Sequence, residues 1–156
     1  MRIGIGDTAP DFTLYDSGKN KITLSENRDH NILLLFFPLA FTSTCTAELC
    51  SVRDNITFYN NVQAKVFGIS VDSLYSLAKY KQEQQLNFTL LSDFNKNVSA
   101  NYGCLYELFS YNMKGVSKRS AFVVDKKGII QYAEILEKAE DQPDFVKINL
   151  ILQDLT

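Results

Sequence analysis

The sequence contains a single histidine, His30, and no tryptophan among 156 residues. So little histidine argues against a histidine-rich metal centre and leaves His30 as the one imidazole available to activate a nucleophile. With only 3 prolines and 7 glycines, no flexible linker divides the chain. The candidate nucleophiles are therefore the three cysteines, at positions 45, 50 and 104.

Neither sign of charge dominates, because 16 Lys and Arg face 18 Asp and Glu and give a net charge of −2. A dedicated nucleic-acid-binding protein normally carries a basic stripe, so this balance argues against one. The longest apolar run, 32–37, stops at Pro38, well short of the roughly 18 residues that a membrane span needs. The N-terminal segment 1–7 lacks the charged-then-apolar pattern of a signal peptide, so a cytoplasmic location is expected.

Strand and helix patterns alternate along the chain. Strands are predicted at 12–15, 21–24, 32–37, 66–71, 89–92, 120–124 and 129–135. Helices are predicted at 45–59, at 73–85 with Asp72 as the N-cap, as a short piece before residue 120, and after Pro143. The turn at 125–128 makes the last two strands a hairpin, so the sheet is mixed. This order predicts a single domain over 1–156 with a thioredoxin-like three-layer α/β/α sandwich, a fold of the α/β class.

Cys45 starts the helix that follows the buried strand 32–37. The apolar stripe of this helix consists of Leu49, Val52, Ile56 and Tyr59. Cys45 falls near the middle of that stripe, so its side chain is expected to point toward the sheet. Free backbone N–H groups and the positive end of the helix dipole favour the thiolate there, which is the nucleophilic form of cysteine. The simpler alternative is a small buried apolar residue.

Cys50 lies five residues after Cys45. In an intact α-helix, residues at this spacing point about 140° apart, with Cα atoms separated by about 8.7 Å. A disulfide tolerates at most about 7 Å. The two thiols are therefore either unconnected or bonded only when the first turns of the helix unwind, as a redox cycle requires. A zinc site is disfavoured, because C-x4-C followed by a lone Cys104 matches no common zinc spacing.

Pro38, Thr42 and Cys45 form the pattern P-x-x-x-T-x-x-C, and with it the chain resembles the peroxiredoxins of the AhpC/TSA superfamily. The likeness extends to segments 6–12, 68–73, 91–93 and 118–125. The C-x4-C spacing is similar to the bacterioferritin comigratory protein (Q-type) group. Segments 39–42 and 48–49 look more like alkyl hydroperoxide reductase E.

The resemblance implies roles for particular residues. Cys45 would be the peroxidatic thiolate that is oxidised to sulfenic acid, and Cys50 the resolving thiol. Thr42 would hydrogen-bond the thiolate and the peroxide, and Pro38 would shield the site from water. Arg119 would stabilise the thiolate and the charge on the leaving oxygen.

Each of these residues also has a simpler structural assignment. Glu48 is expected either to orient Arg119 or simply to complement the helix dipole. Singly, Pro38 could be a strand terminator, Thr42 a capping hydroxyl and Arg119 a solvated side chain. Cys104 has no counterpart in the family and is expected to be a structural thiol.

The predicted function is a thiol-dependent peroxidase that reduces hydrogen peroxide and organic hydroperoxides without a metal or other cofactor. A disulfide between Cys45 and Cys50 would be recycled by a thioredoxin-like reductant. One alternative is a 1-Cys mechanism in which an external thiol resolves the sulfenic acid. Another is a redox-signalling or holdase module that binds client proteins. The sequence leaves open whether the protein is a monomer or a homodimer.

Overall fold

The computed structural model describes residues 3–156. Met1 and Arg2, which begin the segment 1–7 of the signal-peptide prediction, lie outside it. Its strands are β1 (Thr13–Asp16), β2 (Lys21–Thr23), β3 (Asn31–Phe36), β4 (Ala64–Ser70), β5 (Thr89–Ser92), β6 (Ser120–Val124) and β7 (Ile130–Ile135). Its α-helices are α1 (Ser43–Asp54), α2 (Ile56–Asn61), α3 (Leu74–Gln84), α4 (Asn97–Asn101) and α5 (Phe145–Asp154). Two short 3-10 helices, η1 (Leu24–Asn27) and η2 (Ser110–Asn112), complete the order.

The strands form one seven-stranded sheet in the order β2-β1-β5-β4-β3-β6-β7. Strand β4 pairs in parallel with β3 and β5, whereas β6 runs antiparallel to both β3 and β7. The predicted mixed sheet and its final hairpin are therefore confirmed. The central strand β3 is the continuous apolar run of the sequence, and all six of its residues are buried.

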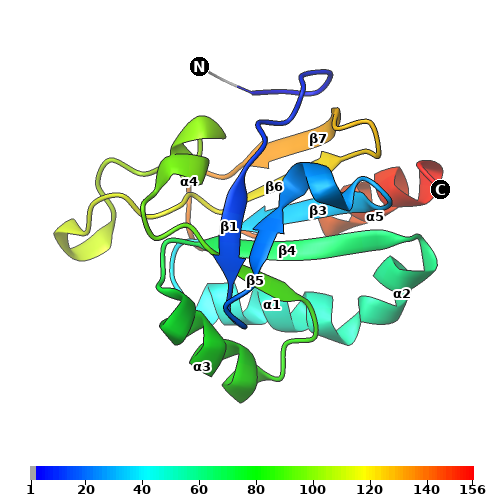
Figure 1. Ribbon diagram of the computed structural model, residues 1–156. Coiled ribbons are helices and arrows are strands. Elements are labelled where there is room, and N and C mark those ends of the chain that lie inside the picture. The colour runs from blue at the N-terminus through cyan, green and yellow to red at the C-terminus, as the bar shows by residue number, and fades with distance from the viewer. Residues whose placement is uncertain (1–2) are drawn as a thin grey trace.

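Alternate side chains of β3 belong to two different cores. Leu33 and Leu35 pack in a cluster that also holds residues of α1, α2, α3 and α5. Ile32 and Leu34 pack on the opposite face, in a cluster completed by the N-terminal segment, η1 and α4. Figure 1 shows α1 and α3 along the lower side of the sheet and α4 at its upper left. The three-layer α/β/α prediction is confirmed, with one outer layer built largely of short elements and loops.

The helix predicted over 45–59 is in fact two helices. It begins at Ser43, and Asn55, with φ −111° and ψ 19°, separates α1 from α2. The Asn55 amide donates to Val52 O at 3.1 Å, which tightens the last turn of α1. The apolar stripe continues across this break, since Tyr59 of α2 is buried in the same cluster as Val52.

The N-cap of α3 also differs from the prediction. Ser73 caps the helix by accepting from the Ser76 amide at 3.1 Å. Asp72 instead accepts from the Ala40 amide at 2.8 Å and from the Ser70 hydroxyl at 2.7 Å. Its carboxylate therefore ties the loop after β3 to the end of β4. Within residues 3–156, none of the helices combines the length and the apolar character that a bilayer crossing requires.

Candidate active site

Cys45 is the third residue of α1 and is 1% exposed. The Thr46 amide makes a helical hydrogen bond to Thr42 O at 3.0 Å. The amides of residues 43–45 precede that bond and belong to the free N–H groups of the helix N-terminus. The Cys45 sulfur thus lies where the helix dipole favours negative charge.

The loop that joins β3 to α1 is held from two sides. Asp72 fixes the Ala40 amide, and the Phe41 ring packs on the Tyr80 ring of α3 with centroids 5.0 Å apart. Phe41 has a φ of 68°, in the left-handed region, which costs a non-glycine residue about 1 kcal/mol or more. The surrounding contacts offset this strain and fix the direction in which α1 starts.

Arg119 immediately precedes β6, and the antiparallel pairing of β6 with β3 places it beside α1. Its Nη2 donates to Cys45 Sγ at 3.2 Å, and its Nη1 donates to Glu48 Oε1 at 2.7 Å. Its Nε and Nη2 both donate to Ala139 O, at 3.2 and 2.9 Å. Burial acts to lower the pKa of Arg119, but the charges of Glu48 and Cys45 and their hydrogen bonds outweigh it and raise that pKa.

Glu48 is fully buried, one helical turn after Cys45. Burial raises the pKa of Glu48 to about 7, although the charge and hydrogen bond of Arg119 act in the opposite direction. The second carboxylate oxygen, Oε2, has no hydrogen-bond partner in the described part of the chain. The carboxyl group is therefore held on the guanidinium by one oxygen only.

This raised pKa predicts a pH dependence of stability. The pKa of Glu48 rises from 4.5 to about 7 on folding, so the folded state binds more protons between these pH values. The free energy of unfolding should therefore fall as the pH rises from 5 to 7.5, by roughly 2 kcal/mol from this group. Glu48→Gln should lack this component, which urea unfolding of both proteins under reducing conditions would measure.

The control for this prediction is Glu26→Gln, a substitution at an exposed glutamate of η1. Its free energy of unfolding should follow that of the wild type at both pH values. A difference between wild type and Glu48→Gln that is equal at pH 5 and pH 7.5 would contradict the assignment of the titration to Glu48.

A cavity of about 230 Å³ opens at Cys45. It is lined by Pro38, Thr42, Ser43, Thr44, Cys45, Phe109, Arg119, Ala139 and Glu140. The structure therefore brings together four residues that the sequence singled out, namely Pro38, Thr42, Cys45 and Arg119. It adds five residues that were not predicted. Ser43 and Thr44 lie between Thr42 and Cys45 in the motif, whereas Phe109, Ala139 and Glu140 come from loops with no recognisable pattern.

The Thr42 hydroxyl is oriented differently from the prediction. It donates to Leu39 O at 2.8 Å, and no hydrogen bond joins it to Cys45 within residues 3–156. The hydroxyl proton is used by the loop that Thr42 ends, so the oxygen of this cavity-lining residue is left as an acceptor. Thr42 can thus receive a hydrogen bond from a peroxide O–H.

Cys50 lies in the same helix as Cys45, as predicted, and all three cysteines of the chain are free thiols. It is half-buried against α3, where its Sγ donates to Gln84 Oε1 at 3.6 Å. Two further contacts join α1 to α3: the Thr46 and Tyr80 hydroxyls, 2.9 Å apart, and Arg53 Nη1, which donates to Gln84 O at 2.6 Å. Cys50 is therefore held away from Cys45 as long as α1 stays folded.

Cys104 lies on the other side of the sheet. It is fully buried in the cluster opposite α1, and burial raises its pKa to about 12 even though a hydrogen bond with Ser120 acts to lower it. A thiol in this state is a poor nucleophile. The geometry agrees with the expected structural role and separates Cys104 from the Cys45 cavity.

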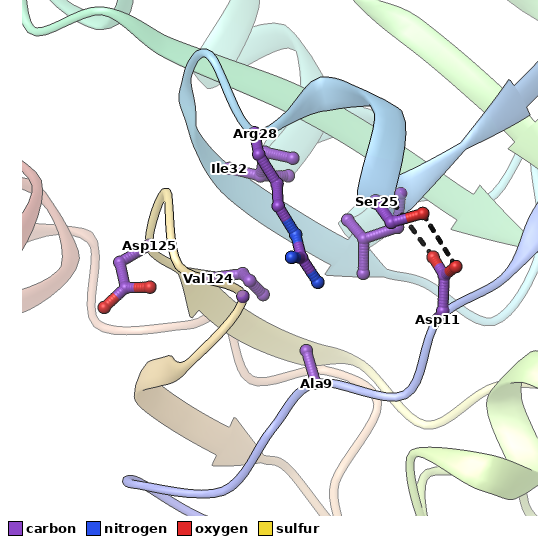
Figure 2. Close-up of a pocket in the computed structure, with 9 residues that line it drawn as sticks. Ala9, Asp11, Ser25, Arg28, Ile32, Val124 and Asp125 are labelled. Atoms are coloured by element: carbon purple, nitrogen blue, oxygen red, sulfur yellow. Dashed lines mark hydrogen bonds between the residues drawn. The ribbon is translucent and has the colours of Figure 1, made fainter.

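A second cavity contains charged groups but has room for little more than one water molecule, at about 20 Å³. Figure 2 shows the Arg28 side chain extending between Asp11 and Val124, with Asp11 bonded to Ser25. Gly128, at φ 82°, leaves space for the guanidinium, since a Cβ there would lie 2.9 Å from Arg28 Nη2. Its lining residues join the N-terminal segment to the rest of the fold, and the cavity is too small for a substrate.

No three His, Cys, Asp or Glu side chains of residues 3–156 are grouped to hold a metal ion.

Comparisons with known proteins agree with the geometry. Residues 5–133 match the model of the AhpC/TSA family. Alkyl hydroperoxide reductase E of Mycobacterium tuberculosis is 38% identical over 141 residues, which cover 88% of this chain and 89% of that protein. The crystal structure of peroxidoxin BcpB from Mycobacterium tuberculosis superposes with a TM-score of 0.88 at 28% identity, over 99% of both chains. A peroxiredoxin-like protein from Aquifex aeolicus, 19% identical with a TM-score of 0.89 over 100% of this chain and 90% of its own, shares the fold.

Proposed function

Because this chain belongs to the AhpC/TSA family of peroxiredoxins and is a thiol peroxidase, we propose that Cys45 is the residue that attacks the peroxide. The observation that carries this proposal is the 3.2 Å contact between Arg119 Nη2 and Cys45 Sγ. A guanidinium donating to sulfur at a helix N-terminus stabilises the thiolate, which is the nucleophilic form. Cys45 also lines the cavity at that terminus, whereas Cys104 is enclosed in the opposite core.

In the first step, the Cys45 thiolate attacks one oxygen of the peroxide. An S–O bond forms as the O–O bond breaks, so sulfur is oxidised to sulfenic acid and the peroxide is reduced. The departing oxygen leaves as an alkoxide or hydroxide and takes a proton from water, giving an alcohol or water. Negative charge therefore moves from sulfur to the leaving oxygen during this step.

The residues around Cys45 fit this movement of charge. Arg119 Nη2 already donates to the sulfur, and the free amides of residues 43–45 lie at the same helix N-terminus. Preorganised donors of this kind lower the barrier because they need no reorientation during the reaction. The Thr42 oxygen accepts a hydrogen bond from the peroxide O–H, Pro38 covers the site, and Glu48 holds the guanidinium in place through its 2.7 Å contact.

In the second step, Cys50 resolves the sulfenic acid. Its sulfur displaces the sulfenic oxygen as water, and a disulfide between Cys45 and Cys50 forms. The two residues occupy the same intact helix, in which Cα atoms five residues apart are separated by about 8.7 Å, beyond the about 7 Å limit of a disulfide. The first turns of α1 must therefore unwind, releasing the contact between Thr46 and Tyr80.

In the third step, a thioredoxin-like dithiol reduces the disulfide and is itself oxidised, which returns both cysteines to thiols. The substrates proposed for this cycle are hydrogen peroxide and organic hydroperoxides. No metal or other cofactor takes part, since the electrons come from the thiols.

Mass spectrometry after one equivalent of hydrogen peroxide tests the proposal. The wild type should yield a peptide pair crosslinked between Cys45 and Cys50. Cys50→Ser should instead carry sulfenic acid on Cys45, trapped with dimedone, and should lose more than about tenfold of its thioredoxin-coupled turnover, because the resolving sulfur is absent.

Two outcomes would contradict parts of this cycle. A Cys50→Ser protein that turns over with thioredoxin as fast as the wild type would show that an external thiol resolves the sulfenic acid. Oxidation of Cys104 in place of Cys45 would overturn the assignment of the nucleophile.

A further inference from the structure

The cavity at Cys45 has an unusual balance of charge. Apart from the proposed Cys45 thiolate, the charged residues in its lining are Arg119 and Glu140. A guanidinium has five N–H donors, and those of Arg119 are directed to Glu48, Cys45 and, twice, to Ala139 O. Arg119 therefore has almost no donor capacity left for a negatively charged group on a substrate.

Glu140 adds negative charge at the opening of this cavity. It is exposed and follows Ala139, whose carbonyl is fixed by Arg119. No basic side chain of residues 3–156 forms an ion pair with it, and Lys118 is paired instead with Glu137 at 3.1 Å. Burial, followed by the charge of Glu137, raises the pKa of the nearby Tyr106, and Glu140 acts on it in the same direction.

Apolar side chains also line the cavity, together with the hydroxyl residues Thr42, Ser43 and Thr44. Phe109 lines the cavity together with Pro38, and its ring packs against Tyr106 with centroids 5.1 Å apart. The Phe109 amide donates to Met113 O at 2.7 Å, which fixes this part of the loop. An alkyl group of a hydroperoxide can therefore contact Pro38 and Phe109, whereas a carboxylate bound in this cavity lies near the charge of Glu140.

From this arrangement we propose that the cavity selects uncharged alkyl hydroperoxides over anionic ones, and that Glu140 is the specificity-determining residue. The inference rests on the proposed role of Cys45 as the peroxidatic thiolate. The guanidinium of Arg119 is already bonded to Cys45 and Glu48, so it does not offset the charge of Glu140. An anionic peroxide is repelled along its approach, and a neutral one of the same size is not.

The test compares an anionic and an uncharged hydroperoxide, a short ω-carboxyalkyl hydroperoxide and its methyl ester, which is larger by one methyl group. Reduced protein at pH 8 and low ionic strength is mixed with each peroxide, quenched with an alkylating agent, and assayed by mass spectrometry for oxidised Cys45. The measured quantity is the ratio of the ester rate constant to the carboxylate rate constant. For the wild type we expect a ratio of about 3 to 10, falling as salt is added.

The variants Glu140→Gln and Glu140→Lys should lower this ratio stepwise, the second to about 1 or below. The matched control is Glu26→Lys, which makes the same change of net charge at an exposed residue of η1, whose neighbour Leu24 packs on the opposite face of the sheet. Its ratio should equal that of the wild type. The inference is overturned if the Glu140 variants leave the ratio unchanged, or if Glu26→Lys lowers it equally. The proposed function itself fails only if Cys45 of the wild type reacts with neither peroxide, which is a separate result.

Discussion

Cys45→Ser is expected to reduce the rate of peroxide consumption by about 10³-fold or more, because it removes the nucleophile. A serine hydroxyl remains protonated beside Arg119 at neutral pH. Peroxide cannot oxidise its oxygen as it oxidises the cysteine sulfur to sulfenic acid. The 3.2 Å contact that stabilises a thiolate then has no anion to act on. Residual peroxide, measured after defined times with thioredoxin and its reductase present, gives the rate.

The comparison variant is Cys104→Ala, which removes the thiol in the opposite core. It should consume peroxide at the wild-type rate as long as it remains folded, which circular dichroism would establish. Cys45→Ser that retains wild-type peroxide consumption would refute the proposed mechanism.

Replacement of Arg119 by methionine should slow the oxidation of Cys45 by about 10²- to 10³-fold. Three effects add: the thiolate loses its cationic partner, the leaving oxygen loses a nearby charge, and Glu48 is left buried without a counter-ion. The chain has no tryptophan, so rapid quenching with an alkylating agent followed by mass spectrometry is the suitable assay.

Arg119→Met also endangers folding, because one partner of a buried ion pair is removed, at a cost of about 3–5 kcal/mol. The double variant Arg119→Met with Glu48→Gln separates the two effects, since a neutral amide tolerates burial better than an unpaired carboxylate. It should recover stability but not the rate of Cys45 oxidation.

Lys118→Met is the control. It deletes a neighbouring positive charge that is paired with Glu137, and it should oxidise Cys45 at a rate within a few-fold of the wild type. Recovery of the full rate by the double variant would show that Arg119 acts only on stability.

The fold was predictable where apolar periodicity and topology agree. The run 32–37 identified β3 because a strand buried on both faces needs apolar residues without alternation. The break between α1 and α2 was not predictable from the same pattern, because the stripe that includes Val52 and Tyr59 stays in phase across Asn55. The N-cap of α3 was misplaced by one residue, since Asp72 and Ser73 both suit a cap. A contact with Ala40, 32 residues earlier, decided between them.

At the site, the residue spacing predicted which side chains meet but not how each one is oriented. The pattern of Pro38, Thr42 and Cys45 placed three residues on one cavity, and Arg119 joined them through the pairing of β6 with β3. The direction of the Thr42 hydroxyl depends on the turn that it closes with Leu39. The contribution of Ala139 comes from its backbone carbonyl, a group that every residue has and no sequence pattern can single out.

The single helix that carries both Cys45 and Cys50 has a consequence for survival under oxidative stress. In the proposed cycle, each sulfenic acid on Cys45 meets one of two ends: α1 opens and Cys50 reaches it, or a second peroxide converts it to sulfinic acid, which a thioredoxin-like donor cannot reverse. Opening is unimolecular and depends on how firmly Tyr80 and Gln84 hold α1, whereas the second oxidation speeds up with peroxide. The packing of α1 on α3 therefore defines a threshold concentration, above which the protein is inactivated faster than it recycles.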